Sequence, residues 1–252
     1  GALVQLGQKQ LLIDTQGNWG NIITGDPNAA GRYIECRLSE FAKEVVFNKK
    51  TTHWIKTYDG KALEPVELPI KFPLLLMQGT EGIAVGLASK ILPHNFNELI
   101  SASIAHLKGE DFQLLPDFPT GGIIYGYEGV KEALMTGRGR VVMRAKTEIE
   151  HTASGRECIV VTEIPYMVNK AEMIKKIADL INEKKIDGIS YINDESDRQG
   201  MRIVIILKQD AVASVVLNTL YKNTPLQSSF AVNNIALVNG RPQLLNLKDL
   251  IH

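Results

Sequence analysis

Residues 158–208 read CIVVTEIPYMVNKAEMIKKIADLINEKKIDGISYINDESDRQGMRIVIILK, and the class of fold follows from this stretch. An apolar run rich in β-branched residues opens it, a helix-like segment capped by Asn169 follows, and two further strand-like runs complete it. With the residues that follow, we predict six elements: strands and helices at 158–164, 170–181, 186–192, 201–208, 211–221 and 230–238. Their order, βαββαβ, is that of a ferredoxin-like two-layer sandwich, which we expect over residues 156–246.

On the C-terminal side of this lobe, Asn239-Gly240 predicts a tight hairpin before a last strand around Leu244. On its N-terminal side, a glycine-punctuated strand is expected at 79–86, and Asn95 with Glu98 forms a capping box for a helix. The whole pattern predicts a mixed α/β (α+β) protein.

Residues 138–146, RGRVVMRAK, alternate between basic and apolar side chains in the manner of a half-buried strand. One face of this strand carries four cations, which we call the basic strip: Arg138, Arg140, Arg144 and Lys146. Such a strip is often only a solvated face. Together with Lys49, Lys50 and Lys56 it is equally suited to hold phosphates, with little sequence preference and a strong salt dependence.

The first 70 residues have a different character. The Gly25-Asp26-Pro27 step predicts the start of a helix, and Ile34, Leu38, Phe41 and Val45 would lie on one buried stripe of it. Tyr33 and Arg32 would lie off that stripe, near the helix start, where free amides favour an anion. The first residues look like the interior of a helix that begins further upstream.

Residues 48–68 are largely polar, contain an Asp59-Gly60 turn and have prolines at Pro65 and Pro69, as a wing or linker would. We therefore expect one domain over residues 1–62 and a second over residues 63–252.

The composition limits the classes of function. Lys and Arg number 28, as do Asp and Glu, so contact with nucleic acid requires a local basic surface. The chain has no apolar run of about 18 residues and no signal peptide, so we expect a cytoplasmic protein without a membrane partner. Cys36 and Cys158 lie outside any metal-binding spacing, and no second ligand stands near His53 or His94, so no metal site is expected in this chain.

The run from Gly20 to Ser39, with Arg32-Tyr33 at its centre, resembles the active-site segment of the A subunits of the bacterial type IIA topoisomerases, gyrase and topoisomerase IV. The resemblance continues in order through QGNWG (16–20), EPVELP (64–69), GIAVGLA (82–88), PHN (93–95), PDFPTGG (116–122), TGRG (136–139), VTEIPY (161–166), DESDRQGMRIVI (194–205) and LQSSF (226–230).

This resemblance implies a partial winged-helix domain followed by an α/β tower. It implies that Tyr33 attacks a DNA phosphodiester and becomes joined to the 5′ end of the broken strand, with Arg32 stabilising the phosphate charge. It also implies that Ile83 wedges between base pairs and bends the DNA. From the pattern alone, Tyr33 could instead pack against a loop, Arg32 form a surface ion pair and Ile83 belong to the core.

The resemblance places the magnesium site and the ATPase on a partner, the B subunit, and it implies that two copies of the full A subunit form a homodimer on double-stranded DNA. Asp194, Glu195 and Asp197 could suggest a metal site within this chain, but they lie in a predicted turn where acidic residues are common, so we interpret them as structural. The expected activity is ATP-dependent passage of one duplex through another. The fragment alone is not expected to perform it.

The main alternative is a non-enzymatic module of the same family that bends DNA through Ile83 and the basic strip. Between the gyrase and topoisomerase IV members of the family, segments such as LPIKFPLLLMQGTEGIAVGLASK (68–90) weakly favour topoisomerase IV.

Overall fold

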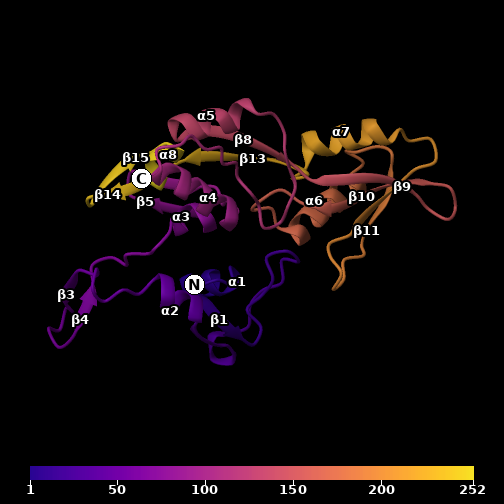
Figure 1. The fold of residues 1–252 in the computed structure, drawn as a ribbon. Coiled ribbons are helices and arrows are strands. Elements are labelled where there is room, and N and C mark those ends of the chain that lie inside the picture. Colours follow the sequence, from indigo (N-terminus) through magenta and orange to yellow (C-terminus); the bar gives the residue numbers. More distant parts are fainter.

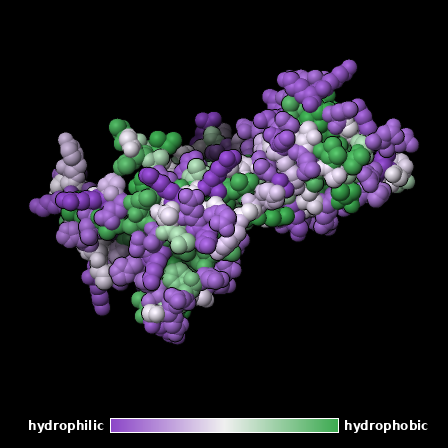
Figure 2. All heavy atoms as spheres, turned by 90° about the horizontal axis from the view of Figure 1, so that it is seen from above, coloured by the Kyte–Doolittle hydropathy of each residue, from purple (hydrophilic) through white to green (hydrophobic).

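The computed structural model describes residues 1–252 and shows an elongated, mixed α/β molecule with three parts. In Figure 1 an N-terminal unit lies below a five-stranded sheet, and a four-stranded sheet forms the opposite end. Seen from above, in Figure 2, the molecule narrows between its two larger parts. The mixed α/β class predicted from the sequence is confirmed.

The N-terminal unit contains short elements around a small core. They are α1 (Ala2–Gln8), β1 (Ile13–Gln16), the 3-10 turn η1 (Gly31–Tyr33), β2 (Glu35–Leu38), α2 (Glu40–Val45), β3 (Trp54–Lys56) and β4 (Leu63–Pro65). Trp19 is buried in this core and its indole N–H donates to the Gln16 carbonyl. The winged-helix assignment stays a prediction.

Because β3 pairs with β4 across the Asp59-Gly60 turn, a boundary between residues 62 and 63 would cut a hairpin, and we place it after β4.

The five-stranded sheet has the order β5-β6-β13-β8-β7, and one of its sides packs against a helix through Val130 and Ala133. Its strands are β5 (Thr80–Ala84), β6 (Leu87–Ile91), β7 (Ile123–Ile124), β8 (Arg138–Arg144) and β13 (Gln227–Asn233). The elements around it are α3 (Leu74–Gln78), α4 (Phe96–Leu107), α5 (Glu128–Thr136), α8 (Leu247–Ile251) and the hairpin of β14 (Ile235–Val238) and β15 (Arg241–Leu244). Val141 and Met143 point from β8 into the core with Phe230 and Val232 of β13. The opposite side of the sheet carries the exposed Arg138 and Arg140, and we call it the open face.

Several predicted local signals act as expected. The Asn95 side chain accepts a hydrogen bond from the Glu98 amide at the start of α4, and Asn169 does the same for Glu172 at the start of α6 (Lys170–Asn182). Asn239 and Gly240 have φ of 52° and 76° and form the turn between β14 and β15. Each signal is a cap or a turn that involves only residues close together in sequence, so its effect does not depend on distant residues.

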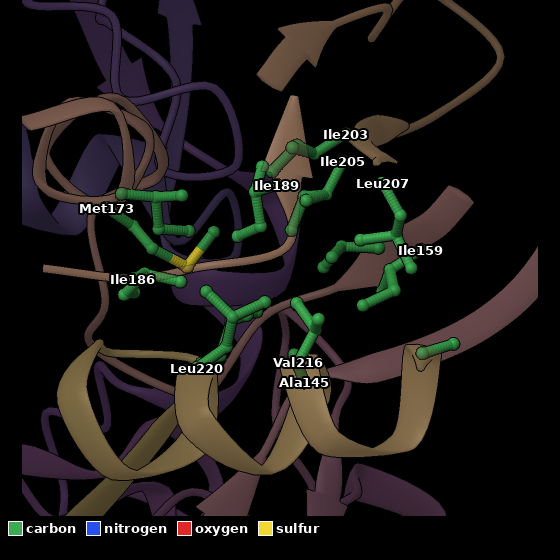
Figure 3. Close-up of a cluster of buried hydrophobic side chains, with 14 of the residues drawn as sticks. Ala145, Ile159, Met173, Ile186, Ile189, Ile203, Ile205, Leu207, Val216 and Leu220 are labelled. Carbon is green, nitrogen blue, oxygen red and sulfur yellow. The ribbon is translucent and has the colours of Figure 1, made fainter. Parts of the chain in front are cut away.

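The four-stranded sheet has the order β11-β12-β10-β9, with every pair antiparallel. It comprises β9 (Lys146–His151), β10 (Glu157–Glu163), β11 (Ile189–Asp194) and β12 (Ile203–Leu207), with helices α6 (Lys170–Asn182) and α7 (Ala213–Asn223). Met173 of α6 and Leu220 of α7 pack against Ile159 and Ile205 of the sheet (Figure 3). Both helices thus bury their apolar sides against one core.

The ferredoxin-like lobe expected over 156–246 needs a correction. The elements occur in the predicted order, but the sixth, β13, pairs with β8 in the other sheet, and β9 occupies the edge beside β10. The run 138–146 is likewise two strands, because the chain passes from one sheet to the other at Ala145, whose amide donates to the Leu226 carbonyl. The two sheets therefore share the chain at this junction.

Candidate nucleic-acid interface

Tyr33 is exposed, with 68% of its surface accessible, at the end of the 3-10 turn η1. Its amide donates to the Ala30 carbonyl, and the Arg32 guanidinium carbon lies 4.9 Å from the centre of its ring. The side chain therefore does not pack against a loop as a core tyrosine would. The phenol and a cation are presented together to solvent.

The predicted helix from Asp26 through Val45 is wrong. Residues 35–38 form β2, which pairs antiparallel with β1, and a helix begins only after Ser39. The Ser39 hydroxyl accepts a hydrogen bond from the Ala42 amide and donates to the Leu11 carbonyl. Pairing with β1 overrides the helical spacing of the apolar residues. Tyr33 therefore does not lie at the N-terminus of an α-helix.

Ile83 stands on the hairpin formed by β5 and β6, and it is 87% exposed. Val85, at the turn, is fully exposed, and Gly86 next to it has φ of 76°. The interpretation of Ile83 as a core residue does not fit this exposure. An apolar hairpin tip directed into solvent is the shape that an inserted wedge requires.

The alternation of the basic strip is present in the structure. Arg138, Arg140 and Lys146 are exposed, whereas Val141 and Met143 between them are buried. Neither Arg138 nor Arg140 forms an ion pair with a carboxylate. These cations are accessible to an anionic partner.

Arg144 has a different environment. Its guanidinium carbon lies 3.5 Å from the ring centre of Tyr125 and 4.3 Å from that of Tyr221, and its Nε–H donates to the Gln227 side chain at 2.8 Å. Two aromatic faces and an amide therefore surround this cation, and it contributes to the junction of the two sheets.

Strand register shows which residues share the open face. Ile83 lies opposite Ala88, while Asn233 lies opposite both Lys90 and Arg138. Because directly paired residues point to the same side of a sheet, the apolar tip and the arginines belong to one face. Tyr33 is on the N-terminal unit, and no hydrogen bond or ion pair of its side chain joins it to this face. Lys49, Lys50 and Lys56 also lie on that unit.

The acidic residues of the β11–β12 turn are engaged in local contacts. Asp194 pairs with the buried Lys170 at 2.9 Å, and Arg202 pairs with both Glu195 and Glu150. Burial raises the pKa of the Asp194 carboxyl, but hydrogen bonds from Ser196 and Lys170 outweigh it and lower that pKa below its ordinary value. These contacts fit the structural interpretation.

No group of three or more His, Cys, Asp or Glu side chains is arranged to hold a metal ion. His94 is buried and its Nδ1–H donates to the Leu76 carbonyl, which is a structural role. None of the helices has the length and apolar character needed to cross a membrane.

Two further residues of interest were not singled out from the sequence. Val85 and Asn233 carry no local signal that separates them from ordinary strand residues. Their importance depends on the hairpin geometry and on pairing between distant strands. Only the position of Val85 between Ala84 and Gly86, close to Ile83, could have suggested a shared tip.

Comparison with known proteins identifies the family. The family model for the A subunit of DNA gyrase and topoisomerase IV matches residues 1–252, so the chain belongs to this family. Similar proteins include the DNA gyrase A subunits of Staphylococcus epidermidis (strain ATCC 12228 / FDA PCI 1200) and of Staphylococcus aureus (strain MRSA252), each 49% identical over 267 residues. Each alignment covers 100% of this chain and 30% of the relative. The weak preference for topoisomerase IV stays a prediction, since the family includes both kinds of enzyme.

Proposed function

We propose that this chain carries the DNA-cleaving tyrosine of a type II DNA topoisomerase and that Tyr33 is the nucleophile. The observation that carries the proposal is the exposure of the Tyr33 phenol beside Arg32, within a chain that matches the A-subunit family along its whole length. The protein acts on double-stranded DNA and changes its topology by passing one duplex through another.

In the proposed step, the Tyr33 oxygen attacks a backbone phosphorus. A P–O bond to tyrosine forms as the bond to the 3′ oxygen breaks, and the phenol proton ends on that oxygen, which leaves as a 3′ hydroxyl. A phosphodiester is exchanged for a phosphotyrosyl diester, so neither water nor ATP is consumed and the 3′ hydroxyl can reseal the strand. A neutral phenol is a weak nucleophile, and Arg32 is positioned to stabilise the charge that develops at the phosphate.

The open face supplies the binding part of this proposal. Arg138 and Arg140 of this face contact phosphates, together with Lys146 of the neighbouring strand β9, and the hairpin tip with Ile83 inserts between base pairs and bends the duplex. Arg144, which the sequence placed among the DNA contacts, acts instead through the two tyrosine rings that surround it.

The remaining machinery is proposed to lie outside this chain. The B subunit provides magnesium and the ATPase, the A subunit forms a homodimer, and the assembly acts on the chromosome in the bacterial cytoplasm. The carboxylates of this chain support a magnesium site on the B subunit, because Asp194 and Glu195 of the β11–β12 turn are paired with Lys170 and Arg202.

The test is to trap a covalent protein–DNA adduct with denaturant, using the full-length A subunit, its B subunit, magnesium and duplex DNA, and then to map the modified peptide. We expect the adduct on Tyr33, its loss in Tyr33→Phe, and its retention in Tyr58→Phe, which removes the hydroxyl from another exposed tyrosine of the same unit.

Duplex binding and bending without any adduct, beside an active homologous enzyme as positive control, would favour the second candidate. That candidate is a DNA-bending module, and the observation in its favour is the exposed apolar tip of Ile83 and Val85.

A further inference from the structure

Asn233 lies where three strands of the open face meet. It is the last residue of β13, and its Cα is paired with Lys90 of β6 on one side and Arg138 of β8 on the other. Its Nδ2 group donates to the Ala88 carbonyl at 2.7 Å, and its Oδ1 accepts a hydrogen bond from Arg138 Nε at 3.2 Å. Both polar groups of the amide form hydrogen bonds, and these two bonds determine its orientation.

This arrangement constrains Arg138 without neutralising it. The hydrogen bond uses Nε–H, while the side chain stays exposed and has no carboxylate partner. The two terminal amino groups of the guanidinium remain free to donate to the two oxygens of a phosphate. An arginine held through Nε presents these groups in one direction.

Two neighbouring cations of the same face are committed elsewhere, whereas Arg140 is exposed but has no side-chain hydrogen bond that orients it. Lys90 pairs with Glu81 at 3.1 Å, and Arg144 lies between Tyr125 and Tyr221. Arg138 is therefore distinguished from them by being both oriented and available. Its support, Asn233, is anchored to Ala88, the residue paired with Ile83 on the apolar hairpin.

We propose that Asn233 is a positioning residue for DNA binding: it holds the Arg138 guanidinium for contact with a backbone phosphate beside the apolar hairpin tip. This inference rests on the proposed function, because it takes duplex DNA as the ligand. The alternative is that Asn233 only ties β6 to β13, in which case its loss would act independently of Arg138.

A double-mutant cycle separates these two roles. Duplex affinity of the full-length A subunit with its B subunit is measured against salt for the wild type, Asn233→Ala, Arg138→Ala and the double variant. We expect Asn233→Ala to weaken binding by about two- to tenfold, as the loss of one hydrogen bond does. Arg138→Ala should reduce the salt slope by about one. The double variant should bind within about twofold of Arg138→Ala alone.

Ser229→Ala, an exposed change on the same strand, serves as the matched control and should leave affinity unchanged. If Asn233→Ala fails to fold, Asn233→Asp replaces it. The carboxylate would pair with Arg138 and weaken phosphate binding, and that loss too should vanish when Arg138 is already alanine. If the loss from the Asn233 substitution and the loss from Arg138→Ala add fully in the double variant, the proposal is overturned.

The outcomes for the two proposals are distinguishable. An adduct on Tyr33 together with additive losses would leave the enzyme function standing and remove the role of Asn233. A coupled cycle without any adduct would keep the positioning role and remove the enzyme function. Failure of the wild type to bind duplex DNA would overturn both.

Discussion

Arg144 is the last residue of β8, and its side chain lies between the rings of Tyr125 and Tyr221. Tyr125 comes from the loop after β7, and Tyr221 comes from α7. Its hydrogen bond to Gln227 adds β13 to the same junction. A cation between two aromatic faces gains attraction from both ring quadrupoles, and a partly buried site strengthens that attraction. The side chain thus links the elements at the narrow part of the molecule.

We predict that Arg144→Ala lowers the free energy of unfolding by about 1–3 kcal/mol, from two cation–π contacts and one hydrogen bond. Chemical denaturation would measure this change. Arg140→Ala, a matched change on the same strand face, should leave stability within about 0.5 kcal/mol and reduce the salt slope of DNA binding. A reduced salt slope with unchanged stability in Arg144→Ala would instead return this residue to the DNA contacts.

His94 gives the protein a predicted dependence on pH. Burial lowers the pKa of its imidazole below the ordinary value of 6.5, although hydrogen bonding to Leu76 opposes this effect. Below that ordinary value the unfolded chain binds a proton that the folded chain excludes, so stability is complete above it and falls as the pH decreases toward the folded pKa. The slope contributed by one such group is at most about 1.4 kcal/mol per pH unit.

Thermal unfolding between about pH 7.5 and pH 5.5 would detect this decrease. His94→Gln keeps an amide that can donate to the Leu76 carbonyl and removes the titrating group, so its stability should fall less steeply over the same interval. An equally steep fall in the variant would assign the acid sensitivity to other groups.

The TGRG motif, residues 136–139, shows how an element is set in place. Gly137 ends α5 in the left-handed region, with φ of 83°. A Cβ on Gly139 would lie 2.6 Å from the Gly129 carbonyl oxygen and 2.8 Å from the Ala133 amide, both on α5. The helix therefore approaches β8 backbone to backbone, which only glycine permits.

We predict that Gly139→Ala lowers the free energy of unfolding by about 1–3 kcal/mol because α5 must move away from β8. Gly82→Ala is the control, since it is also in a strand of this sheet and nothing lies within 4 Å of its added Cβ. Denaturant titration of the two variants should show a loss for the first and little change for the second. Equal stability would mean that the helix can shift at no cost.

At this scale the sequence predicted several features that depend on local chemistry, although no helix starts at the Asp26-Pro27 step. The caps at Asn95 and Asn169 and the turn at Asn239-Gly240 were found because each acts on nearby backbone. The helix through Tyr33 was wrong because β1 competes for residues 35–38, and the partner of β13 was missed because β8 is distant in sequence. In the candidate site, the sequence showed which residues are basic, aromatic or apolar. It could not show that Arg144 lies between Tyr125 and Tyr221, because the fold brings those rings together.

An aromatic cluster contributes to the joint between the N-terminal unit and the rest of the molecule. Phe41 of α2 lies 5.8 Å from Phe72 and 6.0 Å from Phe96 of α4, and the last two are 5.4 Å apart, measured between ring centres. Lys71 strengthens the same place, since its amide donates to the Val45 carbonyl and its side chain pairs with Glu44. Lys9 Nζ also donates to the Gly79 carbonyl at 3.4 Å, so the aromatic cluster is one of several contacts that position Tyr33 relative to the open face.

We predict that Phe41→Ala loosens this joint, because edge-to-face aromatic pairs contribute about 0.5–1.5 kcal/mol each beyond the area they bury. The two parts should then unfold in separate steps in calorimetry, and proteolysis should increase between residues 46 and 73. Phe47→Ala, at an exposed ring outside the cluster, should behave as the wild type does. If the cluster also positions Tyr33 relative to DNA bent by Ile83, Phe41→Ala should lower adduct yield more than duplex affinity. An equal decrease in adduct yield and duplex affinity would mean that the cluster contributes to stability only.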